Sequence, residues 1–452
     1  MKKDRSGTDF DRGRMLPLLM RMALPAIAAQ FVNMLYSIVD RIYIGHIAGV
    51  GTQALAGVGV CNTVILLVAA FAQFTGGGGA PLSAIALGKG QKEKAERILG
   101  NGILLLIVLS VLLMAAVYAF MDPILMATGA SDTTLPYAHS YLSIYMTGTF
   151  FVMVAIGLNP FINVVGHPGI AMASVLIGAA LNIVLDPVFI FALDMGVAGA
   201  ALATVISQAV SAVWILQFLL RRQDTLRIGR SSLKPDAESL RQMGALGVSP
   251  FVMASTESII GFVMNRGLVT YGDAYVSALT IMQSCMMIVS VPSSGFTSGT
   301  SPVISYNYGH GNVERVREGA KITFIIMTGF NLALILWMIL MPSLFARLFT
   351  QDAELIALVS RVMPVFLAGM SIFGMQRACQ TLFVALNQPG ISLFIALLRK
   401  IFLLVPLALI LPSFLGVMGI YAAESIADGT AAICCVIIFA HRFPKILAGM
   451  NR

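Results

Sequence analysis

The chain has 452 residues, of which 58% are hydrophobic and only 11% are charged, with 29 basic against 21 acidic residues and a net charge of +8. Soluble domains carry about a quarter of their residues as charged groups, so this composition excludes a water-soluble protein and a disordered chain. It also excludes a secreted disulfide scaffold, because the five cysteines form no CxxC pair and mostly lie in apolar runs.

Twelve apolar segments are long enough to cross a bilayer, which takes about 20 residues of helix. They cover residues 15–45, 54–86, 98–121, 135–162, 169–193, 198–220, 244–271, 276–306, 322–345, 357–385, 391–412 and 417–440. Turn-forming residues such as Asp122-Pro123 and Gln388-Pro389-Gly390 separate them. The sequence therefore predicts an all-α polytopic membrane protein with 12 transmembrane helices.

The basic residues predict how these helices are oriented. Of the Lys and Arg residues outside the spans, 21 lie in the two terminal segments or after even-numbered spans, whereas Arg347 alone lies on the opposite side. Cytoplasmic segments carry the excess of positive charge in membrane proteins. We therefore expect a multi-pass protein of the cell membrane, with both termini in the cytoplasm.

The chain also repeats itself at an offset of about 221 residues. Gly88-Lys-Gly follows the second span and Gly309-His-Gly the eighth, while Pro168-Gly169 corresponds to Pro389-Gly390. Six spans in each copy give two parallel repeats, an arrangement found in transporters. We expect two six-helix lobes around a central cavity. The boundaries are a tail at 1–14, an N-lobe at 15–220, a linker at 221–243, a C-lobe at 244–440 and a tail at 441–452.

Acidic residues inside spans are candidates for function because burying a charge costs free energy. Asn182 and Asp186 lie one helical turn apart, and a rise of about 1.5 Å per residue places them in the same outer layer as Asp40 and Thr204. Such oxygens suit Na⁺, and two close carboxylates can share a proton. The alternatives are that Asp40 pairs with Arg41 and that Asp186 caps the turn before Pro187.

The second repeat does not copy this cluster. Glu424 stands where Thr204 stands, with Asp428 one turn further on, and Arg399 and Lys400 lie at about the depth of Asp428. We favour a buried ion pair there. Glu257 is either a substrate or ion contact or a structural hydrogen-bonding group.

The stretches Leu181-Asn-Ile-Val-Leu-Asp186-Pro187 and Val39-Asp40-Arg-Ile-Tyr-Ile-Gly45 resemble the multidrug and toxic compound extrusion family, and most closely its MepA-like bacterial branch. The likeness extends from about residue 15 to 445. It implies secondary active efflux of hydrophobic, usually cationic drugs in exchange for H⁺ or Na⁺, by alternating access and with no other cofactor.

The resemblance also implies roles for individual residues. Asp40, Asn182, Asp186 and Thr204 match the positions that hold the coupling ion, with Na⁺ as one possible metal, and Tyr141 matches as well. A C-lobe ion site is not expected, since the carboxylate that accompanies the residue equivalent to Glu257 in another branch is absent here. Substrate contacts are expected from Asn33, Tyr36, Asn159 and Glu257.

Two other functions remain open. One is a flippase for lipid-linked saccharides of the same superfamily, for which Arg41, Arg266, Arg361 and Arg377 would supply positive charge. The other is a polytopic membrane enzyme, but no nucleophile, metal or phosphate motif is evident, so we expect no catalysis. The expected partners are small drugs and the lipid bilayer, with no nucleic acid, and the expected state is a monomer.

Overall fold

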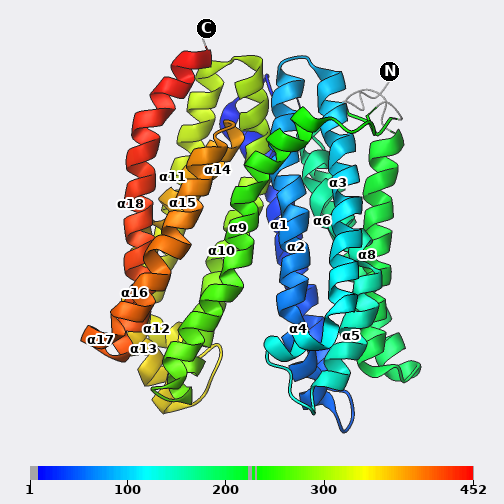
Figure 1. Cartoon of the computed structure of the whole chain (residues 1–452). Helices are drawn as coiled ribbons and strands as arrows, with labels where there is room; N and C mark the ends of the chain where they lie inside the picture. Colours follow the sequence, from blue (N-terminus) through cyan, green and yellow to red (C-terminus); the bar gives the residue numbers. More distant parts are fainter. Residues whose placement is uncertain (1–8, 222–225, 230–231, 451–452) are drawn as a thin grey trace.

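The computed structural model describes residues 9–221, 226–229 and 232–450, except for the side chains of residues 257–259, 262 and 273. Throughout these ranges the regular structure is helical. The helices of the first and second halves of the sequence form two bundles that stand side by side, and α18 ends at the same end of the molecule at which α1 begins (Figure 1). The two halves expected from the repeat are therefore separate in space.

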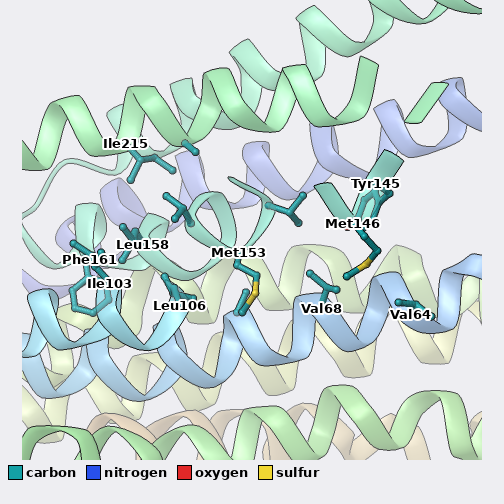
Figure 2. Close-up of a cluster of buried hydrophobic side chains, with 14 of the residues drawn as sticks. Val64, Val68, Ile103, Leu106, Tyr145, Met146, Met153, Leu158, Phe161 and Ile215 are labelled. Atoms are coloured by element: carbon teal, nitrogen blue, oxygen red, sulfur yellow. The ribbon is translucent and has the colours of Figure 1, made fainter. Parts of the chain in front are cut away.

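The first bundle contains eight α-helices and a short π-helical segment, η1. In chain order they are α1 (Met15–Gly45), α2 (Gly51–Gly88), α3 (Lys92–Ala119), α4 (Met121–Ala127), α5 (Leu135–Thr147), α6 (Thr149–Val164), α7 (Pro168–Pro187), η1 (Val188–Ala192) and α8 (Gly196–Arg221). Its buried core joins α2, α3, α5, α6 and α8, and Figure 2 shows Val68, Leu106, Met153 and Ile215 among its side chains.

The second bundle has the same general plan with more interruptions. Its elements are α9 (Ala237–Val269), α10 (Asp273–His310), α11 (Val313–Leu340), α12 (Pro342–Ala346), α13 (Ala353–Leu367), η2 (Gly369–Ile372), α14 (Phe373–Ala385), α15 (Pro389–Leu397), η3 (Leu398–Leu404), α16 (Val405–Ile410), α17 (Pro412–Leu415) and α18 (Val417–Met450). η2 is a 3₁₀ segment and η3 a π-helical one.

Nine helical stretches in the described part of the chain are long and apolar enough to cross a membrane, and two bent helix pairs raise the number to eleven. α9 takes the remaining place in the expected order; it is 33 residues long but polar at its centre, around Ser255 and Thr256. It packs against α2, where a Cβ on Gly78 would approach the Met243 carbonyl oxygen to 2.2 Å. A helix covered by protein needs fewer apolar side chains than one facing lipid, so the expected membrane fold is confirmed.

Two expected continuous spans, 135–162 and 357–385, are in fact bent. α5 and α6 meet at 60° around Gly148, and α13 and α14 meet at 46° around Gly369. A Cβ on Gly148 would lie 2.6 Å from Val205 of α8, and a Cβ on Gly369 would lie 1.7 Å from the Ser425 carbonyl oxygen of α18. These two glycines are 221 residues apart, so each half bends the same helix against the equivalent neighbour.

The C-terminal stretch 441–450, which the sequence analysis assigns to a tail, continues α18. Phe439 and Phe443 stack with ring centroids 4.6 Å apart, and Leu447 is buried against α10, α11 and α14. This apolar contact stabilises the last turns of the helix, which hydropathy averaged over a span does not reveal.

The two bundles touch at the end where α1 begins. A Cβ on Gly88 would lie 2.0 Å from the Tyr306 carbonyl oxygen, and a Cβ on Gly309 would lie 2.1 Å from that of Ile85, so α2 and α10 are in backbone contact. Further along, Gly299 of α10 packs in the same way against Met22 of α1. Toward the opposite end the ribbons of the two bundles diverge (Figure 1).

Candidate functional site

The C-terminal end of α7 and the N-terminal part of α8 bring three of the expected ion-coupling residues together. The Asn182 side-chain amide donates a hydrogen bond to Asp186 Oδ1 at 3.2 Å and lies 3.5 Å from Thr204 Oγ1. Asn182 and Asp186 are buried, with Asp186 fully inaccessible to solvent. Their spacing of four residues places both side chains on one face of α7, and that face packs against α8.

α1 contributes the second acidic residue, Asp40. Its carboxyl group lies close enough to Asp186 for direct interaction between the two carboxyls, and Arg41 also acts on it electrostatically. Asp40 thus has an acidic neighbour across the helix interface and a basic neighbour along the chain, and of the two it is Asp186 that lies within hydrogen-bonding reach. The geometry places two carboxyls from separate helices, α1 and α7, at a single point.

Three buried oxygens of this cluster have no hydrogen-bond donor among the described residues. They are Asp40 Oδ1, Asn182 Oδ1 and Asp186 Oδ2. Two ionised carboxylates cannot donate to each other, and buried oxygens without a donor are costly. A single proton shared between the carboxyls would satisfy the Asp40 and Asp186 oxygens, and a cation ligated by all three oxygens would satisfy Asn182 as well.

Two tyrosines and a glutamine surround the carboxyls. Tyr141 of α5 reaches Thr204, and Tyr36, one turn before Asp40 on α1, reaches Gln208. Tyr36, expected as a substrate contact, therefore borders the acidic cluster. Gln208 was missed by the sequence analysis, although its position one turn beyond Thr204 on α8 is a signal that could have revealed it.

The structure describes the side chains of two of the other three expected substrate residues. Asn33 is exposed on α1. Asn159 of α6 donates its amide to the Ala171 carbonyl oxygen at 3.0 Å and to Ser174 Oγ at 2.9 Å, which ties α6 to α7. The Glu257 side chain lies outside the described residues. Among the expected substrate residues whose side chains are described, only Tyr36 borders the acidic cluster.

The charged residues of the second bundle form the buried ion pair that the sequence favours. The Arg399 guanidinium contacts both carboxylate oxygens of Asp428, through Nε to Oδ1 and through Nη2 to Oδ2 at 3.2 Å. Glu424 Oε1 lies 3.6 Å from the same guanidinium. The guanidinium carbon also lies 4.2 Å from the centre of the Phe373 ring, and all four side chains are buried. Because carboxylates and an aromatic face surround the cation, its charge is balanced within the bundle.

Comparison with known proteins places this arrangement in a family. The sequence model of the MatE family matches residues 25–188 and 251–410, one segment in each bundle. The chain belongs to the MatE family. The family resemblance expected from the sequence is confirmed, and the two matched segments of this MatE protein coincide with its two repeats.

The MatE relatives agree with this over nearly the whole chain. The multidrug export protein MepA of Staphylococcus haemolyticus (strain JCSC1435) is 24% identical over 436 residues, which is 96% of each protein. A MATE crystal structure in the bent conformation superposes with a TM-score of 0.91 at 24% identity, covering 99% of this chain and 100% of the other. An outward-facing structure of a multidrug resistance MATE family transporter superposes with a TM-score of 0.87 at 24% identity, covering 100% of both chains.

Proposed function

We propose that this MatE protein is a secondary active multidrug exporter of the cell membrane that exchanges hydrophobic cationic drugs for H⁺ or Na⁺. The observation that supports it most directly is the buried cluster of Asp40, Asn182, Asp186 and Thr204, in which two carboxyls share one site and three oxygens lack a donor. The name of the MepA relatives supports the substrate class.

The cluster supplies the coupling step. A proton or Na⁺ that enters it neutralises the repulsion between Asp40 and Asp186 and lets α1 pack against α7 and α8. With the cation absent, the two carboxylates repel each other and α1 is displaced from α7. Pro25 lies inside α1 and removes a backbone hydrogen bond there, so this helix has a point at which it can bend. Ion occupancy is thereby linked to the position of α1.

The contact between the bundles supplies the gate. We propose that both termini are cytoplasmic, as the distribution of basic residues indicates. The described state is then closed toward the cytoplasm by α2 and α10, and rocking of the bundles exposes the drug site to each side in turn. Ion and drug exchange because each stabilises a different state of the same two-state equilibrium.

We propose that the drug is held between the lobes by Asn33, Tyr36, Asn159 and Glu257, and that the protein works as a monomer. Tyr36 supports this proposal best, because it contacts Gln208 next to the acidic cluster. Cation binding in the cluster therefore changes the surroundings of a residue that also belongs to the drug site. An aromatic face beside acidic residues attracts organic cations of many shapes.

The deciding experiment is efflux of ethidium from proteoliposomes under a pH gradient and, separately, under a Na⁺ gradient. Asp186→Asn removes the charge with little change of shape, and we expect it to abolish gradient-driven efflux while the protein stays folded. Asp194→Asn is the matched control, because Asp194 is exposed on the loop before α8 and its φ of 51° suits asparagine. Efflux by Asp186→Asn equal to that of the wild type would overturn the proposal.

The flippase alternative is distinguished in the same vesicles. A flippase moves a lipid-linked saccharide and leaves ethidium where it is, whatever gradient is applied. Folded wild-type protein without gradient-dependent efflux would therefore favour the flippase. Turnover of a lipid substrate without any gradient would favour an enzyme.

A further inference from the structure

The two bundles place equivalent residues around the same bend. Gly148 of the first bundle packs against Val205 of α8, and Gly369 of the second packs against Ser425 of α18. The glycines are 221 residues apart and their partners 220 apart, so the repeat is maintained through tertiary contacts. The residue that precedes each partner is Thr204 in α8 and Glu424 in α18.

Equivalent positions of α8 and α18 carry different side chains. In the first bundle Thr204 and Gln208 border the site of Asn182, Asp186 and Tyr36. In the second bundle the equivalent positions carry Glu424 and Asp428, and both contact one cation, the guanidinium of Arg399.

The first bundle has no counterpart of this arginine. The residue 221 positions before Arg399 is Gly178, where a Cβ would lie 2.3 Å from Ser211 Oγ. No side chain fits between α7 and α8 at that point without displacing Ser211. In the second bundle Arg399 lies in η3, the π-helical segment Leu398–Leu404, and is itself 4% exposed.

We propose that Arg399 is a tethered cation that fills the C-lobe counterpart of the N-lobe ion site and so confines exchangeable-cation binding to the N-lobe. Asp428 accepts two hydrogen bonds from the edge of the guanidinium, Glu424 contributes a second carboxylate, and Phe373 covers its face. These are the features of a site for a single monovalent cation, here supplied by the chain itself.

The proposal predicts that removing the guanidinium opens a cation site. Arg399→Met keeps much of the apolar stem and removes the cation that Glu424 and Asp428 both contact. The test is made in an Asp40→Asn/Asp186→Asn background, which lacks the N-lobe carboxylates, and it measures thermal unfolding of purified protein. This inference rests on the proposed ion exchange only where it concerns transport. If ion exchange is disproved, the unfolding test still shows whether removing the Arg399 guanidinium opens a cation site.

The parent and the Arg399→Met variant are compared in choline chloride, in NaCl and in choline chloride with added methylguanidinium, each in acidic and in alkaline buffer. We expect the variant to gain a rise in midpoint of about 3 °C or more with Na⁺, methylguanidinium or acid, and the parent to show none. The proposal is overturned if the variant folds and its unfolding midpoint responds to these cations no more than the midpoint of the parent.

A variant that does not fold is resolved by a second substitution. Arg399→Met/Asp428→Asn removes one acid together with the cation and restores the charge balance. Recovery of folding in the double variant supports the proposal, because an uncompensated charge was then the defect. Failure of both variants overturns it, because Arg399 would then be needed for packing rather than for its charge.

Discussion

Asn182 donates its side-chain amide to Asp186 at 3.2 Å, one turn further along α7, and holds one carboxylate oxygen in a fixed direction. The other oxygen of Asp186 has no donor among the described groups, and Asp40 of α1 is its acidic neighbour. The carboxyl is thus oriented by its own helix but left open toward another. An exchangeable cation requires this combination, since a carboxylate saturated by fixed donors would have little affinity left for the ion.

Asn182 and Thr204 should contribute unequally to efflux, because they make contacts of different strength. Asn182→Leu leaves Asp186 without its donor, and loss of such a hydrogen bond costs about 1–3 kcal/mol, so we expect the gradient-driven efflux rate to fall about 10- to 100-fold. Thr204→Val loses the 3.5 Å contact with Asn182 and the contact with Tyr141 but leaves the donor of Asp186 in place, so the efflux rate should fall only about 3-fold. Thr63→Val, at an exposed position of α2, is the control. Equal effects of the Asn182 and Thr204 substitutions would contradict the graded geometry.

The backbone contact between α2 and α10 should not tolerate a methyl group. A Cβ at position 88 would lie 2.0 Å from the Tyr306 carbonyl oxygen, so Gly88→Ala forces the bundles apart at this end. We expect longer interspin distances between labels at Glu93→Cys and Arg317→Cys in a background without native cysteines. Gly329→Ala, where a Cβ meets open space, is the matched control and should leave the distance unchanged. An unchanged distance in Gly88→Ala would show that this contact does not hold the gate closed.

The segment before α1 is held by the second bundle. Arg315 of α11 donates to the Gly13 and Phe10 carbonyl oxygens at 2.8 and 2.9 Å, and the Phe10 ring lies 5.6 Å from that of Tyr306. Arg315→Ala removes these bonds, and we expect amide hydrogen exchange across residues 9–14 to rise about 10- to 100-fold. Arg317→Ala, exposed on the same helix, should leave exchange unchanged. Protection retained in Arg315→Ala would mean that the Phe10 ring and the Asn307 amide, which donates to the Phe10 carbonyl oxygen at 2.9 Å, are enough to anchor the segment.

The start of α9 predicts a pH dependence outside the membrane. Ser239 donates from its backbone amide and its hydroxyl to Asp236, and these hydrogen bonds lower the pKa of the Asp236 carboxyl below its ordinary value. A depressed pKa stabilises the folded state above the unfolded-state pKa, and this contribution is lost as the pH falls through the folded-state pKa. The difference in thermal midpoint between wild type and Asp236→Ala should therefore shrink in acid. A difference that is independent of pH would contradict ionisation as its source.

Much of the fold was predictable because its signals are local and repeated. Apolar runs, turn residues and the 221-residue repeat identified the helical passages, and α1 begins and ends at the expected residues, Met15 and Gly45. The bends at Gly148 and Gly369 were not predictable, since a glycine in an apolar helix is compatible with a straight or a bent path. Only its neighbour, Val205 or Ser425, decides between the two.

The candidate site, like the fold, was predictable from the sequence only in part. The sequence alone determined that Asn182 and Asp186 share a face of one helix, since helical spacing is a property of the local chain. It also predicted that Arg399, Glu424 and Asp428 lie at similar depth, and the structure brings the three side chains into contact. The tertiary structure decided that Asp40 meets Asp186 across α1 and α7, that Gln208 joins the cluster, and that Asn159 donates to α7. Contacts between helices depend on how each helix is rotated about its axis, and packing against all neighbours at once sets that rotation.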